Sequence, residues 1–282
     1  MNETPGAGGT SAVPPFLPAL IARARAADGQ PPFSDQSLVD LRTGARDLVT
    51  IDEVGVALVS ATEAELVIDP DARGRGLGTT LLEKVLARTT GELLVWAHGD
   101  HPAARALAAS HGLDAVRELL HLRTALGPGD TATTTPPAVP GLSAFRPGLD
   151  DDAWLRLNAS AFAHHPEQGS VSQADLDELI GEDWFSPDDF LLLWDNEELA
   201  GYCWLKVEDG SGEFYVVGVD PNRQGQGLGR ILTEAGLRRL RHRGVTSAHL
   251  YVEGDNIAAV RLYRSLGFLD DSIDIQYRAP AR

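Results

Sequence analysis

A glycine-rich turn in the second half of the chain has the composition of an anion-binding site. The turn follows an apolar, β-branched run that ends at Asp220, and it precedes a run with apolar residues at helical spacing. Strand, turn and helix in this order direct backbone N–H groups and the positive end of a helix dipole at one point, which suits a phosphate. Similar turns also occur in dinucleotide folds and as plain structural turns, and neither a Walker sequence nor a complete Gly-x-Gly-x-x-Gly is present.

The same pattern occurs earlier in the chain. Aligning Asp69 with Asp220 superimposes the two glycine turns without a gap, so that Arg73 takes the place of Gln224. A chance match of this length is improbable, so we infer an internal repeat and predict two tandem domains of one fold. Strands are mixed with helices in both halves, which predicts an α/β (α+β) fold in which helices flank a mixed central sheet.

Composition limits the partners. The net charge is −17 and the pI is about 4.8. This disfavours nucleic acid or an anionic membrane as a partner and fits a substrate with a cationic group, although a generally acidic solvated surface has the same composition. The single cysteine, Cys203, excludes an internal disulfide and fits a reducing cytoplasm, and its strand-like surroundings predict a core residue. No apolar run is long enough to span a membrane. We expect a cytoplasmic monomer.

Two segments of low complexity divide the chain. Residues 1–15 are rich in Gly, Thr, Ser and Pro, and we predict disorder there. Residues 127–141 consist largely of Thr, Pro and Gly and predict a linker. The N-terminal domain then spans residues 16–126 and the C-terminal domain residues 142–282. We expect closing strands at residues 121–123 and 273–277.

The spacing Gln224-x-x-Gly227-x-Gly229 resembles the pyrophosphate-binding motif of the Gcn5-related N-acetyltransferase family. The ending from Asn256 through Tyr263 to Gly267-Phe268 is similar to that of the same family. The resemblance implies acetyl-CoA as co-substrate. In the second copy it implies coenzyme contacts from Val217, Gly218, Val219, Gln224, Gly225, Gln226, Gly227, Leu228, Gly229, Arg230, Asn256, Ile257, Ala258, Ala259, Val260 and Arg261. In the first copy it implies contacts from Leu66, Val67, Ile68, Arg73, Gly74, Arg75, Gly76, Leu77, Gly78 and Thr79.

The two copies differ at the residue that the family uses as an acid. The resemblance implies that Tyr263 protonates the leaving thiolate, whereas an isolated tyrosine there would simply pack on a helix face. The alignment places Ala108 at this position in the first copy. Because alanine cannot donate a proton, we predict that the first copy binds acetyl-CoA weakly or structurally and does not turn over.

Transfer to an amine also needs a base, because an alkylammonium must first lose a proton. Glu213 stands at the head of the central strand, and strict alternation would place Tyr215, Val217 and Val219 on its side of the sheet. We predict that Glu213 is this base, acting directly or through water; a surface carboxylate at a strand end is the alternative. Its register counterpart in the first copy is Thr62, or Glu63 if a bulge shifts the strand.

Residues 161–169 and 183–190, with the tandem arrangement, resemble a group within the family that acetylates the cysteinyl amine of cysteinyl-glucosaminyl-inositol. The resemblance implies substrate contacts at Glu167, Tyr251 and, with a shorter side chain than the family's usual glutamate, Asp35. A helix N-cap is the other interpretation of Asp35. Lys206 on a central strand is either a specific substrate contact or a strand-end lysine.

No metal site is expected, because His164 and His165 are adjacent, point apart and have no third ligand at a suitable spacing. Two other functions stay open. One is acetylation of a protein N-terminus or another small amine. The other is a non-catalytic acyl-CoA sensor.

Overall fold

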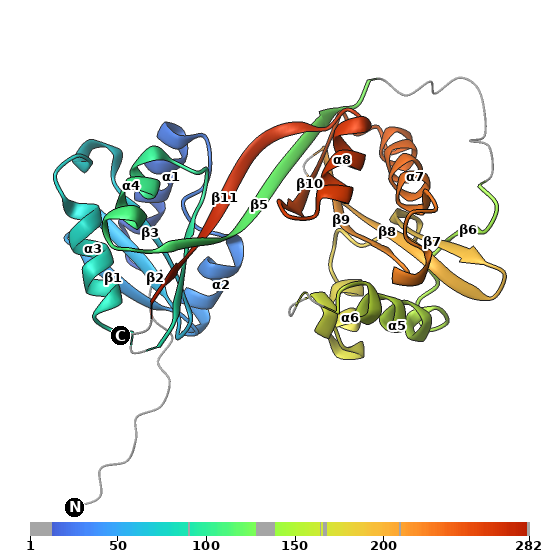
Figure 1. The fold of residues 1–282 in the computed structure, drawn as a ribbon, viewed down its shortest axis with the longest axis horizontal. Helices are drawn as coiled ribbons and strands as arrows, with labels where there is room; N and C mark the ends of the chain where they lie inside the picture. The colour runs from blue at the N-terminus through green and yellow to red at the C-terminus, as the bar shows by residue number, and fades with distance from the viewer. Residues whose placement is uncertain are drawn as a thin grey trace, which may run out of the picture. The chain divides into compact units, whose positions relative to one another are not determined.

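The computed structural model describes residues 13–89, 91–127, 139–163, 165, 168–208 and 210–280. These residues form two compact units, which are taken one at a time below (Figure 1). Unit 1 comprises residues 1–119 and 272–282, and unit 2 comprises residues 120–271. Most of the segment predicted to be disordered, residues 1–12, and most of the predicted linker, residues 128–138, lie outside the described residues.

Unit 1 has a mixed sheet in the order β1-β2-β3-β4-β11. Strands β1, β2 and β3 are antiparallel, β4 is parallel to β3, and β11 is antiparallel to β4. Its elements are α1 (Leu17–Asp28), α2 (Asp35–Thr43), β1 (Asp47–Ile51), β2 (Gly55–Val59), β3 (Glu63–Ile68), α3 (Leu77–Leu86), β4 (Leu93–Ala97), α4 (Pro102–Ser110), the first part of β5 (Asp114–Ala125) and the second part of β11 (Leu269–Ala279).

Alternating side chains give the unit 1 sheet two apolar faces. Val56, Leu58 and Val67 pack against α1 and α2, whereas Ala57 and Ala64 pack against α3 and α4. Residues one apart on a strand point to opposite faces, so β1, β2 and β3 each contribute to both clusters. Helix α2 begins where the Ser34 side chain accepts a hydrogen bond from Ser37 N–H at 3.1 Å, which satisfies one of the free donors of the first turn.

Unit 2 has a mixed sheet in the order β5-β10-β9-β8-β7-β6. Neighbours from β6 to β9 are antiparallel, and β10 is parallel to β9. The elements are β6 (Leu142–Ala144), α5 (Asp151–Ala161), α6 (Gln173–Ile180), β7 (Phe190–Asp195), β8 (Glu198–Glu208), β9 (Ser211–Val219), α7 (Leu228–His242), β10 (Ser247–Glu253) and α8 (Ile257–Ser265). The prediction of two folds, each with a mixed sheet and flanking helices, is confirmed.

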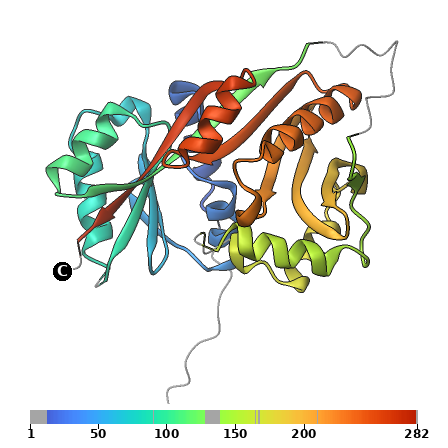
Figure 2. The same ribbon diagram turned by 45° about the vertical axis from the view of Figure 1, so that its right-hand side comes forward.

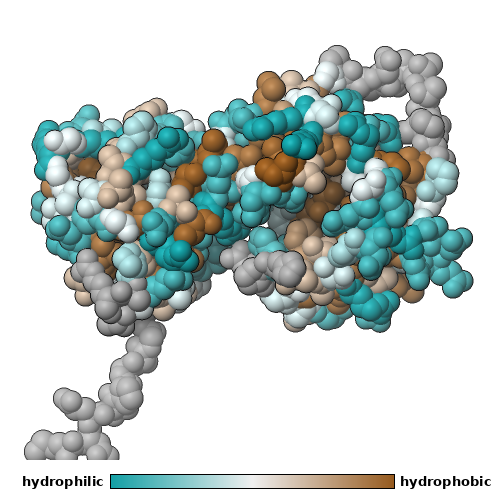
Figure 3. Space-filling model, in the orientation of Figure 1, coloured by the Kyte–Doolittle hydropathy of each residue, from teal (hydrophilic) through white to brown (hydrophobic). Residues whose placement is uncertain are grey.

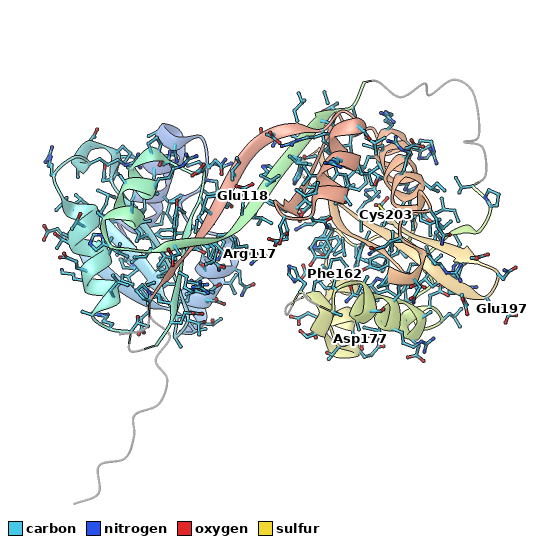
Figure 4. All side chains as sticks on the ribbon, in the orientation of Figure 1. Arg117, Glu118, Phe162, Asp177, Glu197 and Cys203 are labelled. Carbon is cyan, nitrogen blue, oxygen red and sulfur yellow. The ribbon has the colours of Figure 1, made fainter. Side chains whose placement is uncertain are left out.

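Helices cover both faces of the unit 2 sheet (Figure 2). On one face, α5 and α6 cover an aromatic cluster in which Trp154, Tyr202 and Trp204 are buried. On the other face lies α7, where a Cβ on Gly236 would come within 3.0 Å of the Cys203 sulfur, so glycine permits the close approach. Cys203, labelled on β8 in Figure 4, is fully buried, as predicted. The outer face of each unit drawn in Figure 3 is mainly hydrophilic.

Each of the two predicted closing strands, at residues 121–123 and 273–277, lies in the opposite unit from the one predicted. Residues 273–277, predicted to close the C-terminal domain, belong to unit 1, where Ile275 and Tyr277 pair with Ala97 and Val95 of β4. Residues 121–123, predicted to close the N-terminal domain, belong to unit 2, where β5 lies beside β10. Both segments alternate polar and apolar side chains, a pattern that fits either sheet edge, so their sequence does not say which edge they take.

Strand β9 carries a bulge that β3 lacks. Leu205 pairs with Phe214 and Trp204 pairs with Val216, so Tyr215 is an extra residue in β9. Strand β3 pairs with β2 in one unbroken register. A bulge places two successive residues on one face of the strand, and Tyr215 and Val216 accordingly both contact the aromatic cluster beneath α5 and α6.

Candidate active site

The glycine turn of unit 2 has the geometry of an anion cradle. Gly225 and Gly227 have φ angles of 77° and 82°, a region that side-chain-bearing residues rarely adopt. A Cβ on either glycine would meet nothing within 4 Å, so the space above the turn is open. The first hydrogen bond of α7 runs from Ile231 N–H to Gly227 O, which leaves the preceding N–H groups for an outside acceptor.

Unit 1 repeats this cradle and adds a cavity. Gly74 and Gly76 have φ angles of 73° and 77°, and Thr80 N–H donates the first helical bond to Gly76 O. A cavity of about 490 Å³ begins at this turn and is lined by Ile68, Trp96, His98, Ala108 and Tyr277, among others. The guanidinium of Arg73, a predicted coenzyme contact, is bound at 2.7 Å by each oxygen of Asp28.

In both units two parallel strands separate beside the cradle. Strand β10 pairs with β9 over only three residues, from Ser211–Ser247 to Glu213–His249, although β9 continues to Val219. Strand β4 likewise pairs with β3 over three residues, ending at Glu65–Trp96. The backbone of β9 from Phe214 onward therefore has a partner on the β8 side and an open edge on the β10 side.

Glu213 lies at the last paired position before this opening, on the face beneath α5 and α6. Gly212 faces α7, since a Cβ there would meet Leu240, so its neighbour Glu213 faces the opposite side. The prediction that Val217 and Val219 share the face of Glu213 is wrong. The bulge at Tyr215 reverses the alternation, and Val219 lies on the α7 face beside Leu232.

The surroundings of Glu213 suit a base. Its side chain is 23% exposed, and burial is the main cause that raises the pKa of Glu213, partly offset by Lys206. Lys206 forms an ion pair with Glu208 at 2.8 Å and lies 5.2 Å from the centre of the Trp184 ring. The ammonium group is thus turned toward Glu208 and Trp184, and Glu213 has no direct cation partner among the described residues.

Tyr263 approaches from the other face. It lies on α8, its side chain is buried, and its ring is 5.8 Å from that of Phe268, which in turn packs against Phe214. Burial raises the pKa of Tyr263 further above its already basic ordinary value, so the phenol keeps its proton at neutral pH. Glu213 and Tyr263 therefore belong to opposite faces of the sheet, Glu213 beneath α5 and α6 and Tyr263 on the face that α7 covers.

Comparison with known proteins agrees with this arrangement. The model of the acetyltransferase (GNAT) family matches residues 52–113 and 154–268. The chain belongs to the GNAT acetyltransferase family. A protein named Mycothiol acetyltransferase from Clavibacter sepedonicus is 47% identical over 274 residues, covering 92% of this chain and 90% of that protein. Another of that name, from Streptomyces scabiei, is 46% identical over 93% of this chain and 90% of its own length.

Solved structures share the GNAT fold over nearly the whole chain. A GCN5-related N-acetyltransferase from Sphaerobacter thermophilus superposes with a TM-score of 0.68 at 23% identity, covering 95% of this chain and 92% of that chain. A tandem GNAT protein from the clavulanic acid biosynthesis pathway superposes with a TM-score of 0.63 at 20% identity, covering 95% of each chain. The predicted membership in a tandem acetyltransferase family is confirmed.

The first GNAT unit has the same carboxylate in a different environment. Once the bulge is counted, Glu63 is the counterpart of Glu213, because Glu63 pairs with Leu94 where Glu213 pairs with His249. Arg46 donates to Glu63 at 2.8 Å and Gln276 donates at 3.2 Å. Ala108 is buried at the position of Tyr263. At these two positions unit 1 therefore has a carboxylate bound by a guanidinium and an alanine in place of the phenol.

The predicted substrate residues have different outcomes. Tyr251 is 51% exposed and its ring stacks 4.6 Å from that of His121. Asp35 is the first residue of α2, and the N-cap is Ser34. Glu167 and His164 lie outside the described residues. Asn256, a predicted coenzyme contact, caps α8 by accepting from Ala259 N–H at 3.1 Å. Arg230 donates to Ser265 at 2.6 Å.

The sequence analysis missed His249, which faces Glu213 in the sheet. Its Nε2 is 3.8 Å from a Glu213 carboxylate oxygen and its Nδ1 is 3.2 Å from Ser211 Oγ. The alternation Ser247, His249, Tyr251 in a strand next to the predicted central strand was the available signal.

Among the described residues, a membrane-spanning helix and a cluster of metal ligands are both absent. Within that part of the chain, none of the helices combines the length and the hydrophobicity needed to cross a membrane. In the same part, three or more potential ligands from His, Cys, Asp and Glu do not gather around one point.

Proposed function

We propose that this protein transfers the acetyl group of acetyl-CoA to the cysteinyl amine of cysteinyl-glucosaminyl-inositol, the last step of mycothiol biosynthesis. The observation that carries the proposal is the identity of 44% to 47% with relatives named Mycothiol acetyltransferase over at least nine-tenths of the chain. The arrangement of a desolvated carboxylate, an open strand edge and a glycine cradle in unit 2 supports the same reaction.

In this proposal the coenzyme occupies the α7 face of unit 2. Its diphosphate accepts hydrogen bonds from the N–H groups of the turn at residues 224–230, where the positive φ angles leave the backbone accessible. Its pantetheine arm pairs with the open edge of β9 at residues 217–219 as an added strand. The thioester then lies in the opening between β9 and β10.

The acceptor amine approaches the opening from the opposite face, where Glu213 takes its proton directly or through one water. The nitrogen forms a bond with the thioester carbonyl carbon, the carbon–sulfur bond breaks, and Tyr263 gives a proton to the leaving thiolate. The acylated nitrogen then loses its remaining extra proton, which restores the Tyr263 phenol and leaves a neutral amide. Because the base Glu213 and the acid Tyr263 lie on opposite faces of the sheet, the two groups act on the thioester from opposite sides. Ionised Glu213 and protonated Tyr263 coexist at neutral pH because their ordinary pKa values lie far apart.

Unit 1 binds acetyl-CoA in its cavity without turnover. The cradle glycines at 74 and 76 support binding, whereas the Arg46 contact to Glu63 and the alanine at 108 argue against catalysis. We place Lys206, Tyr251, Glu167 and Asp35 at the acceptor and expect the enzyme to act as a cytoplasmic monomer.

The test compares acceptors. Purified protein is incubated with acetyl-CoA and cysteinyl-glucosaminyl-inositol, an N-terminal peptide or an aminoglycoside, and the products are identified by mass spectrometry because the first acceptor has its own thiol. Acetylation of the cysteinyl amine that is lost in Glu213→Gln is the expected result. Acetylation of the peptide alone would replace this proposal with protein N-terminal acetylation, and coenzyme binding without any product would leave an acyl-CoA sensor.

A further inference from the structure

The closest polar neighbour of Glu213 across the strand opening is a histidine that the reaction scheme does not use. His249 is the register partner of Glu213 at the last rung of the β9–β10 ladder. Register partners on parallel strands direct their side chains to the same face, so the imidazole and the carboxylate are held side by side by the backbone. Their closest polar atoms, His249 Nε2 and Glu213 Oε2, are 3.8 Å apart.

The other ring nitrogen fixes the state of the imidazole. Ser211 Oγ is 3.2 Å from His249 Nδ1 and has a hydrogen to donate to it. When Ser211 donates to Nδ1, the proton of the neutral ring resides on Nε2, which faces Glu213. The charged groups around the ring are Arg123 on β5, Asp271 on β11 and Lys206 on β8, with His121 edge-on at 5.3 Å. Burial, then His121 and Arg123, lower the pKa of His249 to about 4, so the ring is neutral at physiological pH.

A neutral donor and a cation have different effects on a base. In general, a cation beside a carboxylate stabilises the anion and reduces its tendency to take a proton. A neutral N–H group orients the carboxylate and offsets part of its desolvation while leaving it basic. Unit 1 supplies the internal comparison, because the residue that faces Glu63 in the corresponding rung is Leu94, which has no donor.

We propose that His249 is a positioning residue for the catalytic base: its neutral imidazole, whose Nε2 lies 3.8 Å from Glu213 Oε2, stabilises the ionised Glu213 carboxylate electrostatically at the edge of the strand opening. This inference rests on the proposed acetyl transfer for its role in catalysis. The contact itself is a property of the free protein, so it can be measured whether or not the proposed acceptor is correct.

The first experiment follows the Glu213 carboxyl carbon by NMR during a pH titration of the unliganded protein, with Glu213→Gln to assign the signal. His249→Leu, which installs the residue of unit 1, should raise the pKa of Glu213 by roughly half to one unit, because the anion loses a donor. His249→Gln keeps an N–H donor and should stay within about 0.3 units of the wild type. An unchanged Glu213 titration in a folded His249→Leu protein would overturn the proposal.

The second experiment measures kcat/KM against pH with the acceptor that the protein uses. In His249→Leu the apparent pKa of the limb of the kcat/KM profile that rises with pH should increase by the same amount as the Glu213 pKa measured by NMR. The rate at pH 7 should fall about tenfold, and KM for acetyl-CoA should change less than about twofold. His249→Gln should return the apparent pKa of this limb to the wild-type value. The matched control His242→Leu removes an exposed histidine at the end of α7 and should leave the limb in place.

The two experiments separate the two ideas. His249→Leu could lower the melting temperature without changing the apparent pKa of the kcat/KM limb or the pKa of Glu213. That result would assign His249 a purely structural role and would contradict the proposal. If no amine is acetylated by the wild type, the proposed function fails, while the NMR titration still decides whether His249 holds Glu213.

Discussion

The same carboxylate has a different environment in each repeat. Glu213 and Glu63 occupy matching rungs, but Glu213 faces a neutral imidazole whereas Glu63 is bound by Arg46. Burial with little compensation keeps Glu213 basic, and a guanidinium at 2.8 Å neutralises Glu63. The difference between a working base and a structural carboxylate therefore depends on the groups within about 4 Å rather than on the residue type.

Tyr263→Phe removes the proton that the leaving thiolate is expected to take. We expect kcat to fall about 10²-fold while KM for acetyl-CoA changes less than about twofold, because the ring stays packed on Phe268. Steady-state kinetics checks this. The control Tyr202→Phe removes a buried hydroxyl that donates to Asn158 at 2.6 Å, and it should lower the melting temperature but leave kcat near the wild-type value. Full activity in Tyr263→Phe would remove the phenol from the mechanism.

The rate should depend on pH through Glu213. Burial raises the pKa of Glu213 above its ordinary value of 4.5, and the base must be ionised to accept a proton. Activity should therefore fall as the pH is lowered through this raised pKa, and Glu213→Gln should reduce kcat by roughly 10²–10³-fold and abolish that limb. Rate profiles over the acidic range of pH test both statements. A limb that persists in Glu213→Gln would identify a different group as the base.

At the scale of elements, a turn and a bulge decide what the site can do. The glycine turns expose N–H groups at the start of α3 and α7 because their φ angles are positive. The bulge at Tyr215 turns Glu213 toward the α5 side while Val217 and Val219 line the α7 side. In the proposed mechanism, the coenzyme on one side and the acceptor on the other meet at the opening of β9 and β10.

Substitution of the cradle glycines distinguishes the two units. Gly227→Val forces a β-branched side chain into a left-handed conformation over the anion cradle, and it should weaken acetyl-CoA binding to unit 2 by at least about tenfold and suppress turnover. The matched change Gly76→Val should spare turnover and reduce the binding stoichiometry from two coenzymes to one. Calorimetric titration of both variants checks this. Equal loss of turnover in both would show that unit 1 takes part in catalysis.

At the scale of the whole molecule, unit 1 consists of two separate stretches of chain, whereas unit 2 is one continuous stretch that begins within β5 and ends within β11. Strand β11 begins in unit 2 and continues into unit 1, where Ile275, Tyr277 and Ala279 are part of the core that α3 and α4 cover. Strand β5 begins in unit 1 and continues into unit 2. Each unit therefore depends on residues from the other half of the sequence.

Removal of residues 272–282 should destabilise unit 1 although all of residues 1–119 are present. The deletion exposes the edge of β4 and removes three side chains of the core cluster, each of which contributes about 1–3 kcal/mol of burial. We expect the low-temperature transition in a melting curve to fall by at least about 10 °C, or unit 1 to be unfolded. Limited proteolysis would identify which unit is cleaved. Unchanged melting would contradict the assignment of this strand to unit 1.

A buried histidine links the same strand to the stability of unit 1. His98 Nδ1 is 3.0 Å from Asp274 of β11, and its Nε2 is 3.7 Å from Glu65 of β3. Burial opposes the charge of His98, but Asp274 and Glu65 outweigh it and raise its pKa from 6.5 to about 9. The imidazolium therefore contributes fully below pH 6.5, and this stability is lost as the pH rises through about 9.

We accordingly predict that the free energy of unfolding of unit 1 decreases between pH 7 and pH 9.5 by on the order of 2 kcal/mol. His98→Gln has no proton to lose in this range and should flatten the dependence. Chemical unfolding at several pH values measures both proteins. A steeper dependence in His98→Gln than in the wild type would show that other groups dominate.

The sequence by itself determined the repeat, the fold and both cradles, because glycine spacing and strand–turn–helix periodicity are local properties of the chain. It also predicted Glu213 and Tyr263 as site residues and placed an alanine at the position of Tyr263 in unit 1, and these roles stay predictions. The bulge at Tyr215, the histidine that faces Glu213, the arginine that neutralises Glu63 and the exchange of β5 and β11 came only from the tertiary structure. Each of these depends on which strand lies beside which, and the pairing free energy is summed over contacts between residues far apart in sequence, so no local pattern specifies it.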